Sequence, residues 1–157
     1  MKEAKTLNQL KIIPVDSTNW RQIISLEVAE SQSGYIERNE ISILESVYDK
    51  EHHWYCYGLY EEETPVGFVM IGAENKEERY IWLDRFMIDK NAQGKGLGGA
   101  FLDLVVKFIA KHYDVAEIVL SVAKDNPKAM SFYQKYGFDK TGLIDPEFDE
   151  EIFVYKL

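Results

Sequence analysis

The chain has 157 residues, of which 46% are hydrophobic and 13% aromatic. That length suits one domain with its own core, and that composition excludes a disordered chain. Eighteen Lys and Arg stand against 27 Asp and Glu, so the formal net charge is −9. This balance disfavours nucleic acid and anionic membranes as partners and favours cations. We expect a single domain over residues 1–157.

The one cysteine, Cys56, excludes a disulfide within the chain. The apolar stretch near the start, residues 7–15, is too short and too polar for a signal peptide or a membrane span. We therefore expect a cytoplasmic protein. The sequence allows a homo-oligomer without fixing its order.

In chain order, residues 11–15 predict a short strand. Polar residues 16–18 offer caps for a first helix over about 18–30, where apolar residues recur at roughly helical spacing. Residues 35–50 predict a second helix. Four apolar side chains suggest its face: Ile41, Leu44, Val47 and Tyr48.

The residue composition changes in the middle of the chain. Residues 54–61, 65–74 and 79–89 are rich in aromatic and β-branched side chains, which favour strands. The polar links between them are short, so we expect antiparallel hairpins. An apolar stripe then predicts a helix over 97–112.

The last third alternates between strands and a helix. Residues 117–123 read as a buried strand. A helix follows, with Asn126 as its cap and Pro127 at its first position, and it stops at Gly137. Two final strands lie near 138–144 and 151–156. This order predicts a mixed α/β (α+β) fold with a mostly antiparallel sheet of about seven strands and about four helices on both faces.

Residues 93–99 read Gln-Gly-Lys-Gly-Leu-Gly-Gly and join a predicted strand to a predicted helix. Each glycine costs about 1 kcal/mol in a helix interior relative to alanine. A glycine loop at a helix N-terminus, however, presents unpaired amides and the positive end of the helix dipole. Phosphate oxygens approach such amides where no side chain intervenes. We therefore predict an anion site, with Lys95 as a counter-charge at its rim.

Two alternatives remain for these glycines. One is a structural turn that lets strand and helix pack closely. The other is the dinucleotide pattern G-x-G-x-x-G, which Gly94, Gly96 and Gly99 satisfy. A dinucleotide fold calls for alternating parallel units and an acidic residue after the next strand, whereas here a meander precedes the loop and Lys124 follows that strand.

Two motifs carry a resemblance to a known family. Residues 93–98 resemble the acetyl-CoA motif Q/R-x-x-G-x-G/A of the GCN5-related N-acetyltransferase (GNAT) superfamily. Its second motif resembles the set Asn126, Ala129, Phe132, Tyr133, Gly137 and Phe138. The resemblance covers nearly the whole chain, including the order of elements. Lys90 departs from it, since many members have proline there, and Gln93 is the less common of the two residues allowed at its position.

The resemblance implies acetyl-CoA as co-substrate and no metal. The pantetheine arm would pair with the backbone of Phe86, Met87 and Ile88, where an amide can polarise the thioester carbonyl. Asn126 would cap its helix and also contact the coenzyme. The pyrophosphate would lie on the glycine loop, whose binding residues are Gln93, Gly94, Lys95, Gly96, Leu97, Gly98 and Gly99.

Tyr133 matches the tyrosine of this family that protonates the leaving thiolate. A phenol of pKa about 10 is a weak acid toward a thiolate whose thiol has a pKa of about 8.5. We therefore expect Tyr133 to contribute only modestly to the rate of transfer. The alternative is a packed aromatic on a helix.

The acceptor is suggested by two segments, residues 31–37 and 82–89, which resemble those of bacterial spermine/spermidine (diamine) acetyltransferases. That resemblance makes Tyr35, Glu37 and Asp84 the candidates for binding a polyamine. A polyamine carries ammonium groups spaced along methylene stems, which suit carboxylates along an aromatic-lined groove. Either carboxylate could also accept the proton of the reacting amine, directly or through water.

Each of these residues also has a purely structural interpretation, which stays open. Asp84 could simply pair with Arg85, and Glu37 could be a solvated charge. His52 and His53 read as surface or strand-edge residues, and Cys56 as a small core residue. The leading hypothesis is an N-acetyltransferase for polyamines. Its alternatives are the same chemistry on another small amine or a protein amine, and a coenzyme A- or dinucleotide-binding domain without transfer activity.

Overall fold

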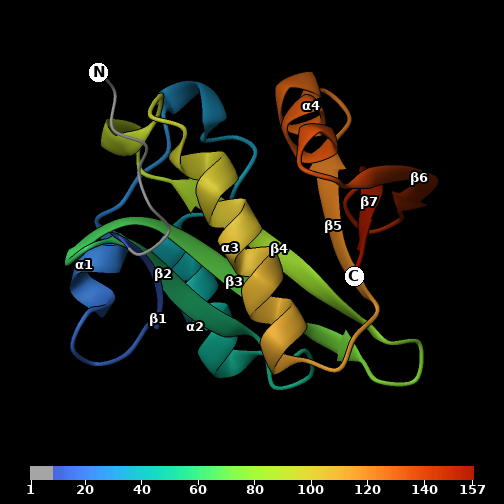
Figure 1. Ribbon diagram of the computed structural model, residues 1–157, viewed down its shortest axis with the longest axis horizontal. Coiled ribbons are helices and arrows are strands. Elements are labelled where there is room, and N and C mark those ends of the chain that lie inside the picture. Colours follow the sequence, from blue (N-terminus) through green and yellow to red (C-terminus); the bar gives the residue numbers. More distant parts are fainter. Residues whose placement is uncertain (1–8) are drawn as a thin grey trace.

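The computed structural model describes residues 9–157, which form one seven-stranded sheet with helices on both faces (Figure 1). The strand order is β1-β2-β3-β4-β5-β7-β6. The strands are β1 (Leu10–Pro14), β2 (Tyr55–Glu61), β3 (Thr64–Asn75), β4 (Tyr80–Ile88), β5 (Glu117–Ala123), β6 (Asp139–Asp145) and β7 (Glu150–Lys156). The α-helices are α1 (Trp20–Ile24), α2 (Asn39–Tyr48), α3 (Leu97–His112) and α4 (Pro127–Lys135), and short 3-10 turns occupy η2 (Glu30–Gln32) and η3 (Lys90–Ala92).

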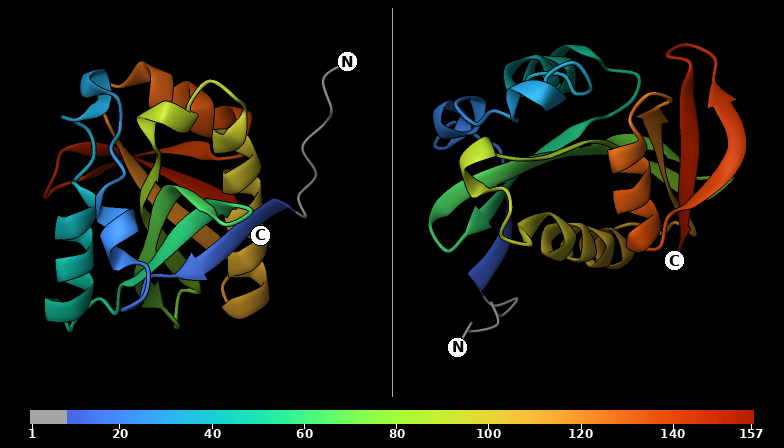
Figure 2. Two further views of the ribbon diagram at one scale, coloured as in Figure 1. Left: turned by 90° about the vertical axis from the view of Figure 1, so that its left-hand side faces the viewer. Right: turned by 90° about the horizontal axis from the view of Figure 1, so that it is seen from above.

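The sheet separates two hydrophobic clusters. The larger lies between the sheet and α3, with α4 packed against it, and includes Phe101, Val105 and Phe138. The smaller lies under α1 and α2 and includes Ile23, Phe68 and Met70. Figure 2 shows α1 and α2 on one side of the sheet and α3 on the other. No helix within residues 9–157 is long and apolar enough to cross a membrane.

The predicted fold class is confirmed, but the predicted helix over 18–30 is wrong. Helix α1 ends at Ile24, because the chain beyond it binds the end of β4 instead of continuing to turn. The amide of Glu27 donates to the Asp89 carboxylate (2.9 Å), and the Glu27 carbonyl accepts from the amide of Lys90 (2.7 Å). These bonds span more than sixty positions, so no local periodicity announces them.

Helix α2 forms within the predicted range, but its apolar face points outward. Its four apolar residues on that face are exposed: Ile41, Leu44, Val47 and Tyr48. The inner side instead buries Asn39 and Ser42. Asn39 Nδ2 donates to the Ile23 carbonyl (2.9 Å), and Ser42 Oγ accepts from Arg85 (3.1 Å). A polar inner side fits here because the sheet presents a guanidinium to it.

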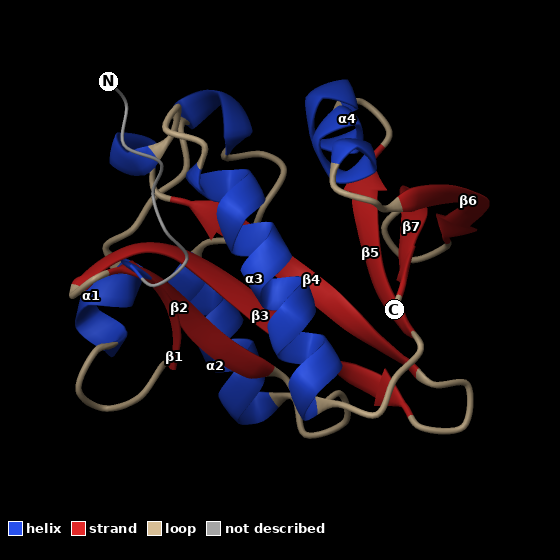
Figure 3. Ribbon diagram, in the orientation of Figure 1, coloured by secondary structure: helices blue, strands red, loops and turns tan. Residues whose placement is uncertain are grey.

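Strands β4 and β5 part soon after they meet. They pair in parallel at only three positions, the last being Trp82 with Val119. Beyond that point β5 pairs with β7, whereas β4 continues with β3 alone. Figure 3 shows β5 leading to α4, whereas β4 runs behind α3. A β-bulge lies just past the last pair, because Leu83 and Arg85 pair with neighbouring β3 residues and Asp84 is the extra residue between them. Such bulges re-aim a side chain, often next to an active site.

Candidate active site

The glycine loop between η3 and α3 offers open backbone donors. Gly94 and Gly96 have φ of 79° and 76°, the left-handed region that glycine adopts without strain. A Cβ at either position would meet nothing within 4 Å, so the approach to the backbone is clear. Within residues 9–157, no hydrogen bond uses the amides of 94–96 as donors, and the first amides of α3 have no acceptor within the helix. This geometry suits an anion.

The remaining residues of the loop hold it in place. Leu97 is buried in the core and fixes the start of α3. Gly99 allows close packing, since a Cβ there would overlap the Tyr136 ring and hydroxyl. Gln93 Nε2 donates to the Ile88 carbonyl (2.9 Å) and to Gln32 Oε1 (2.8 Å), which ties the loop to the end of β4. Lys95 is exposed and makes no ion pair among the residues that the structure describes.

The end of β4 has one free edge. Phe86, Met87 and Ile88 pair with β3 on one side, and β5 has already left on the other. Backbone donors and acceptors on that free edge need partners, and an extended ligand can supply them. The side chains anchor the strand, since Met87 and Ile88 are buried and the Phe86 ring stacks on Phe132 of α4 (6.4 Å between centroids, 24° between planes).

Helix α4 brings an aromatic cluster to this edge. Asn126 Oδ1 caps the helix by accepting from the amide of Ala129 (3.2 Å), as predicted, and Pro127 follows at the first helical position. Phe132 contacts the ring of Tyr133 (5.2 Å between centroids), which contacts Phe138 in turn (5.7 Å). Both predicted motifs therefore meet at the end of β4 through Phe132.

Burial raises the pKa of Tyr133 above its ordinary value. The phenol therefore stays protonated at neutral pH and beyond. Its hydroxyl makes no hydrogen bond within residues 9–157. A protonated phenol with an uncommitted hydroxyl can donate to a developing anion, although a raised pKa makes that donation weaker.

Asp84, at the bulge, belongs to a cluster of charges on the α2 side of the sheet. Burial raises the pKa of Asp84, the Arg85 guanidinium lowers it, and the charges of Glu45 and Glu150 raise it further. Arg85 is shared unequally, because it binds both oxygens of Glu45 (2.9 and 3.2 Å) while its Nε lies 3.5 Å from Asp84. The pairing of Asp84 with Arg85 is therefore real but loose, and Asp84 keeps 28% of its side chain exposed.

Glu150 adds a further carboxylate to this cluster, from the β5–β7 side of the place where β4 and β5 diverge. It begins β7, pairs with Ala123 at the end of β5, and accepts a hydrogen bond from Ser121 Oγ (2.8 Å). Neither Glu45 nor Glu150 was predicted from the sequence, and Arg85 was considered only as an ion-pair partner of Asp84. Each is an ordinary charge in its local sequence, and no signal there could have found it.

Tyr35 and Glu37 lie apart from Asp84. The Tyr35 hydroxyl donates to the Asp125 carbonyl (3.1 Å), so the loop before α2 crosses to the connection that precedes Asn126. Glu37 is exposed on the same loop, without an ion pair inside residues 9–157. The structure thus brings Tyr35 beside the second motif, and within residues 9–157 no hydrogen bond or ion pair joins Tyr35 or Glu37 to Asp84.

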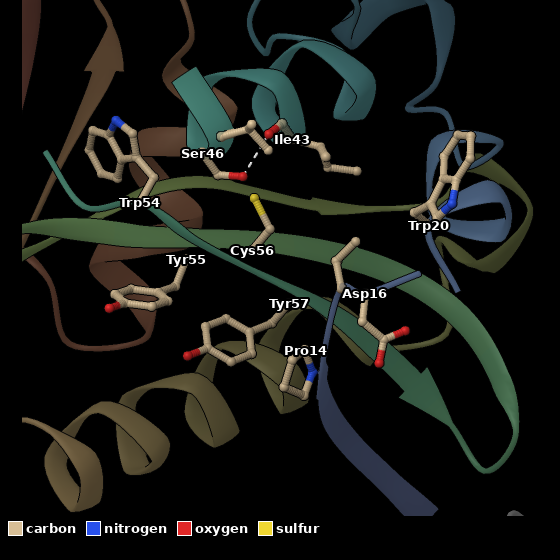
Figure 4. A pocket seen from close by; sticks show the side chains of 11 residues that line it. Pro14, Asp16, Trp20, Ile43, Ser46, Trp54, Tyr55, Cys56 and Tyr57 are labelled. Atoms are coloured by element: carbon tan, nitrogen blue, oxygen red, sulfur yellow. Dashed lines mark hydrogen bonds between the residues drawn. The ribbon is translucent and has the colours of Figure 1, made fainter. Parts of the chain in front are cut away.

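Cys56 lies elsewhere, half-buried beside a hollow of about 480 Å³ between β1, β2 and α2 (Figure 4). Aromatic rings line this hollow, among them Trp20, Trp54 and Tyr57. Burial raises the pKa of the Cys56 thiol to about 11, so it is not a thiolate at neutral pH. It packs against the smaller cluster, which agrees with a small residue of the core. No group of metal-ligating side chains forms a cation site within residues 9–157.

Comparison with known proteins identifies relatives along most of the chain. A family model described as "Acetyltransferase (GNAT) family" matches residues 19–138. A probable spermine N(1)-acetyltransferase of Bacillus subtilis subsp. natto (strain BEST195) is 38% identical over 143 residues, which cover 87% of this chain and 91% of that protein. A spermine/spermidine N(1)-acetyltransferase of Bacillus subtilis (strain 168) is 37% identical with the same coverage.

Solved structures share the fold at lower identity. The spermidine N-acetyltransferase of Vibrio cholerae, in complex with CoA and spermine, matches with a TM-score of 0.74 and 20% identity over 95% of this chain and 96% of that one. PaiA N-acetyltransferase of Thermoplasma acidophilum, in complex with coenzyme A, matches with a TM-score of 0.66 and 18% identity over 94% of this chain and 99% of that one.

The charge cluster predicts a pH-dependent loss of stability in Arg85→Met. This variant leaves Glu45 and Asp84 without their cation, at a cost of about 1.5–3 kcal/mol near neutral pH, or roughly 3–10 °C in melting temperature. The pKa of Asp84 is already raised and rises further without Arg85. Its protonated form is then favoured in the folded state, so stability falls as pH rises through the folded pKa and returns as pH is lowered.

Thermal unfolding of this variant between neutral and mildly acidic pH measures the effect. Arg79→Met is the matched control, because Arg79 pairs with the exposed Asp114 and should change the melting temperature little. A deficit that is equally large at every pH would show that Arg85 stabilises by packing alone.

Proposed function

Because the chain belongs to the acetyltransferase (GNAT) family, we propose that it is a cytoplasmic N-acetyltransferase that transfers the acetyl group of acetyl-CoA to a primary amine of a spermine- or spermidine-type polyamine. One arrangement carries the proposal. The free edge of β4 begins at the charge cluster around Asp84 and runs to the open amides of the glycine loop. The names of the two Bacillus relatives support the choice of acceptor.

The residues present fit acetyl-CoA, which supplies an activated thioester. The amides of 94–99 and the dipole of α3 receive the pyrophosphate, with Lys95 at the rim. The free edge of Phe86, Met87 and Ile88 binds the pantetheine arm as a strand would. One of its amides polarises the thioester carbonyl. Asn126 lies beside this path, and Gln93 holds the loop to the strand.

Transfer needs a neutral amine, a polarised carbonyl and a proton for the departing sulfur. The amine nitrogen attacks the carbonyl carbon, a C–N bond forms and the C–S bond breaks. Tyr133 donates a proton to the thiolate and recovers one from the nitrogen of the new amide. Because its pKa is raised, the phenol remains available as an acid across the working pH range.

The acceptor side is built for a cation with more than one charge. Glu45 and Asp84 contact the Arg85 guanidinium from two elements, and Glu150 of β7 adds a third negative charge that acts on Asp84. Tyr35 and Glu37 offer a second contact on the loop beside α4. Ammonium groups spaced along methylene stems can engage both places at once, which a monoamine cannot.

Gly96→Asp tests the coenzyme site. The added carboxylate would stand among the phosphates, so we expect acetyl-CoA affinity measured by calorimetry to fall at least tenfold. Gly142→Asp is the control, because Gly142 also has a left-handed φ (83°) and open space around its Cβ but lies on β6. Equal affinity in both variants would contradict the assignment. Binding of NAD but not coenzyme A by the wild type would favour the dinucleotide alternative.

Tyr133→Phe removes only the hydroxyl. We expect kcat to fall by roughly 10² or more, with the melting temperature nearly unchanged because the ring contacts remain. Tyr48→Phe, on the exposed side of α2, serves as control. Normal turnover in Tyr133→Phe would leave this residue only its packing role.

The function itself is tested by release of free thiol from acetyl-CoA with spermine, spermidine, putrescine, amino acids and peptides as acceptors. We expect the polyamines to be preferred. Glu37→Gln and Asp84→Asn should each lower kcat/KM for spermidine roughly ten- to a hundredfold, since one charge-assisted hydrogen bond contributes about 1.5–3 kcal/mol. A monoamine should lose less.

Asp114→Asn, an exposed carboxylate on the α3–β5 connection, is the matched control for both variants. Acetyl-CoA binding should be intact in all three. Equal losses for spermidine and a monoamine would contradict a two-point grip, and a preference for peptides would reassign the acceptor.

A further inference from the structure

The turn after α2 holds a histidine and a carboxylate in a fixed arrangement. His52 Nδ1 lies 2.7 Å from Asp49 Oδ2, which also accepts from Trp54 Nε1 (3.1 Å). The other Asp49 oxygen accepts from the amides of Glu51 and His52 (3.1 and 3.2 Å). The His52 ring stacks on Trp54 (5.6 Å, 26°). With Nδ1–H donated to the carboxylate, Nε2 carries the lone pair and makes no bond within residues 9–157.

This pair lies on the same side of the sheet as the charge cluster. The amide of Asp49 donates to the carbonyl of Glu45 (2.8 Å), so the pair follows Glu45 by one helical turn, about 5.4 Å along the axis. Glu45 in turn binds Arg85 beside Asp84. His52 also lines an open hollow of about 920 Å³ together with Trp82, the last β4 residue that pairs with β5.

The charges around His52 come from several elements. The hydrogen bond that His52 donates to Asp49 raises the pKa of His52, partial burial lowers it, and the charges of Asp49, of Glu51 and of Glu147 on the β6–β7 connection raise it. Protonated His52 lowers the pKa of Asp84 in turn, so the two groups interact. The β3–β4 hairpin contributes three charged residues to the same hollow: Glu74, Lys76 and Glu77.

We propose that His52, held by Asp49, is the base that removes the proton from the acceptor ammonium, an inference that rests on the proposed acetyl transfer. The proton passes from the ammonium nitrogen to Nε2, and the lone pair thus freed attacks the thioester carbonyl carbon. The C–N bond forms, the C–S bond breaks, and Tyr133 supplies the thiolate with a proton that it regains from the amide nitrogen. Because 45% of its side chain is exposed, His52 then releases its proton to water.

A histidine suits this step better than the carboxylates nearby. An aliphatic ammonium has a pKa of about 10, against ordinary values of about 6.5 for histidine and about 3.9 for aspartate. The transfer equilibrium therefore favours imidazole over carboxylate by roughly 10²–10³-fold. Proton transfer is most efficient when the pKa of the base lies near the working pH. The carboxylates of the cluster then bind the cation, and His52 removes its proton.

Kinetics of His52→Gln across roughly pH 6 to pH 10 test the proposal. We expect kcat/KM for spermidine near neutral pH to fall by roughly 10², while KM for acetyl-CoA stays the same. The deficit should shrink as pH rises, because more of the amine is already neutral. His53→Gln is the matched control, since the neighbouring His53 is exposed, lacks the contact with Asp49 and should change neither rate nor profile.

Asp49→Asn separates a base from a structural residue. Loss of the carboxylate lowers the pKa of His52, so the rising limb of kcat/KM, which reports deprotonation of the base, should move to lower pH. NMR titration of the His52 ring should show the same shift. Addition of spermidine to the CoA-bound enzyme should also lower this pKa, because a cation enters beside the ring.

The outcomes distinguish this inference from the function on which it rests. A wild type that releases no thiol with any polyamine contradicts the proposed function. An active wild type whose His52→Gln variant keeps its rate and profile overturns the assignment of His52. If that variant instead loses activity equally at every pH and has a lowered melting temperature, the assignment of His52 as the base is also overturned. His52 would then only stabilise the turn after α2.

Discussion

Strand β4 loses its partner on one side after Trp82, and the rest of the site depends on that loss. A strand inside a sheet satisfies its backbone groups on both edges, so the free edge of residues 83–88 must be satisfied by water or by a ligand. The bulge at Asp84 lies at the start of this edge, and Gln93 binds the carbonyl at its end. Because the β4–β5 pairing ends early, one edge of β4 is open to an extended ligand. The Asp84 bulge marks the start of this open edge, and the hydrogen bond from Gln93 marks its end.

Packing keeps the two diverging strands from closing on each other. Phe132 contacts Phe86 across the gap and also lies against Gly98, where a Cβ would stand 3.5 Å from its ring. Tyr136, the residue directly after α4, occupies the space above Gly99. The glycines thus do two things: those at 94 and 96 leave the backbone open, and those at 98 and 99 let α4 approach α3.

On the α2 side of the sheet, charged and polar contacts add to the smaller hydrophobic cluster. Arg85 is largely buried and needs partners, which Glu45 and Ser42 supply from the inner side of α2. This explains why the helix turns its apolar residues to the outside. It also leaves Asp84 only partly neutralised, and Glu150 adds a second charge from β7. The resulting excess of negative charge lies at the start of the free edge, where it favours a cation.

Local patterns determined the elements, because their causes are local. The apolar stripe of 97–112, the buried strand 117–123 and the cap at Asn126 were predictable, since spacing, β-branching and capping act within a few residues. The loop 93–99 and Tyr133 were predicted as site residues by motif, and the open backbone of the loop follows from glycine itself. Tertiary structure decided the rest: where α1 ends, which side of α2 faces inward, and which charges surround Asp84. Those outcomes depend on contacts between residues about forty or more positions apart, such as Glu27 with Asp89 and Glu45 with Arg85, and the energy of such contacts exists only once the sheet has brought the segments together.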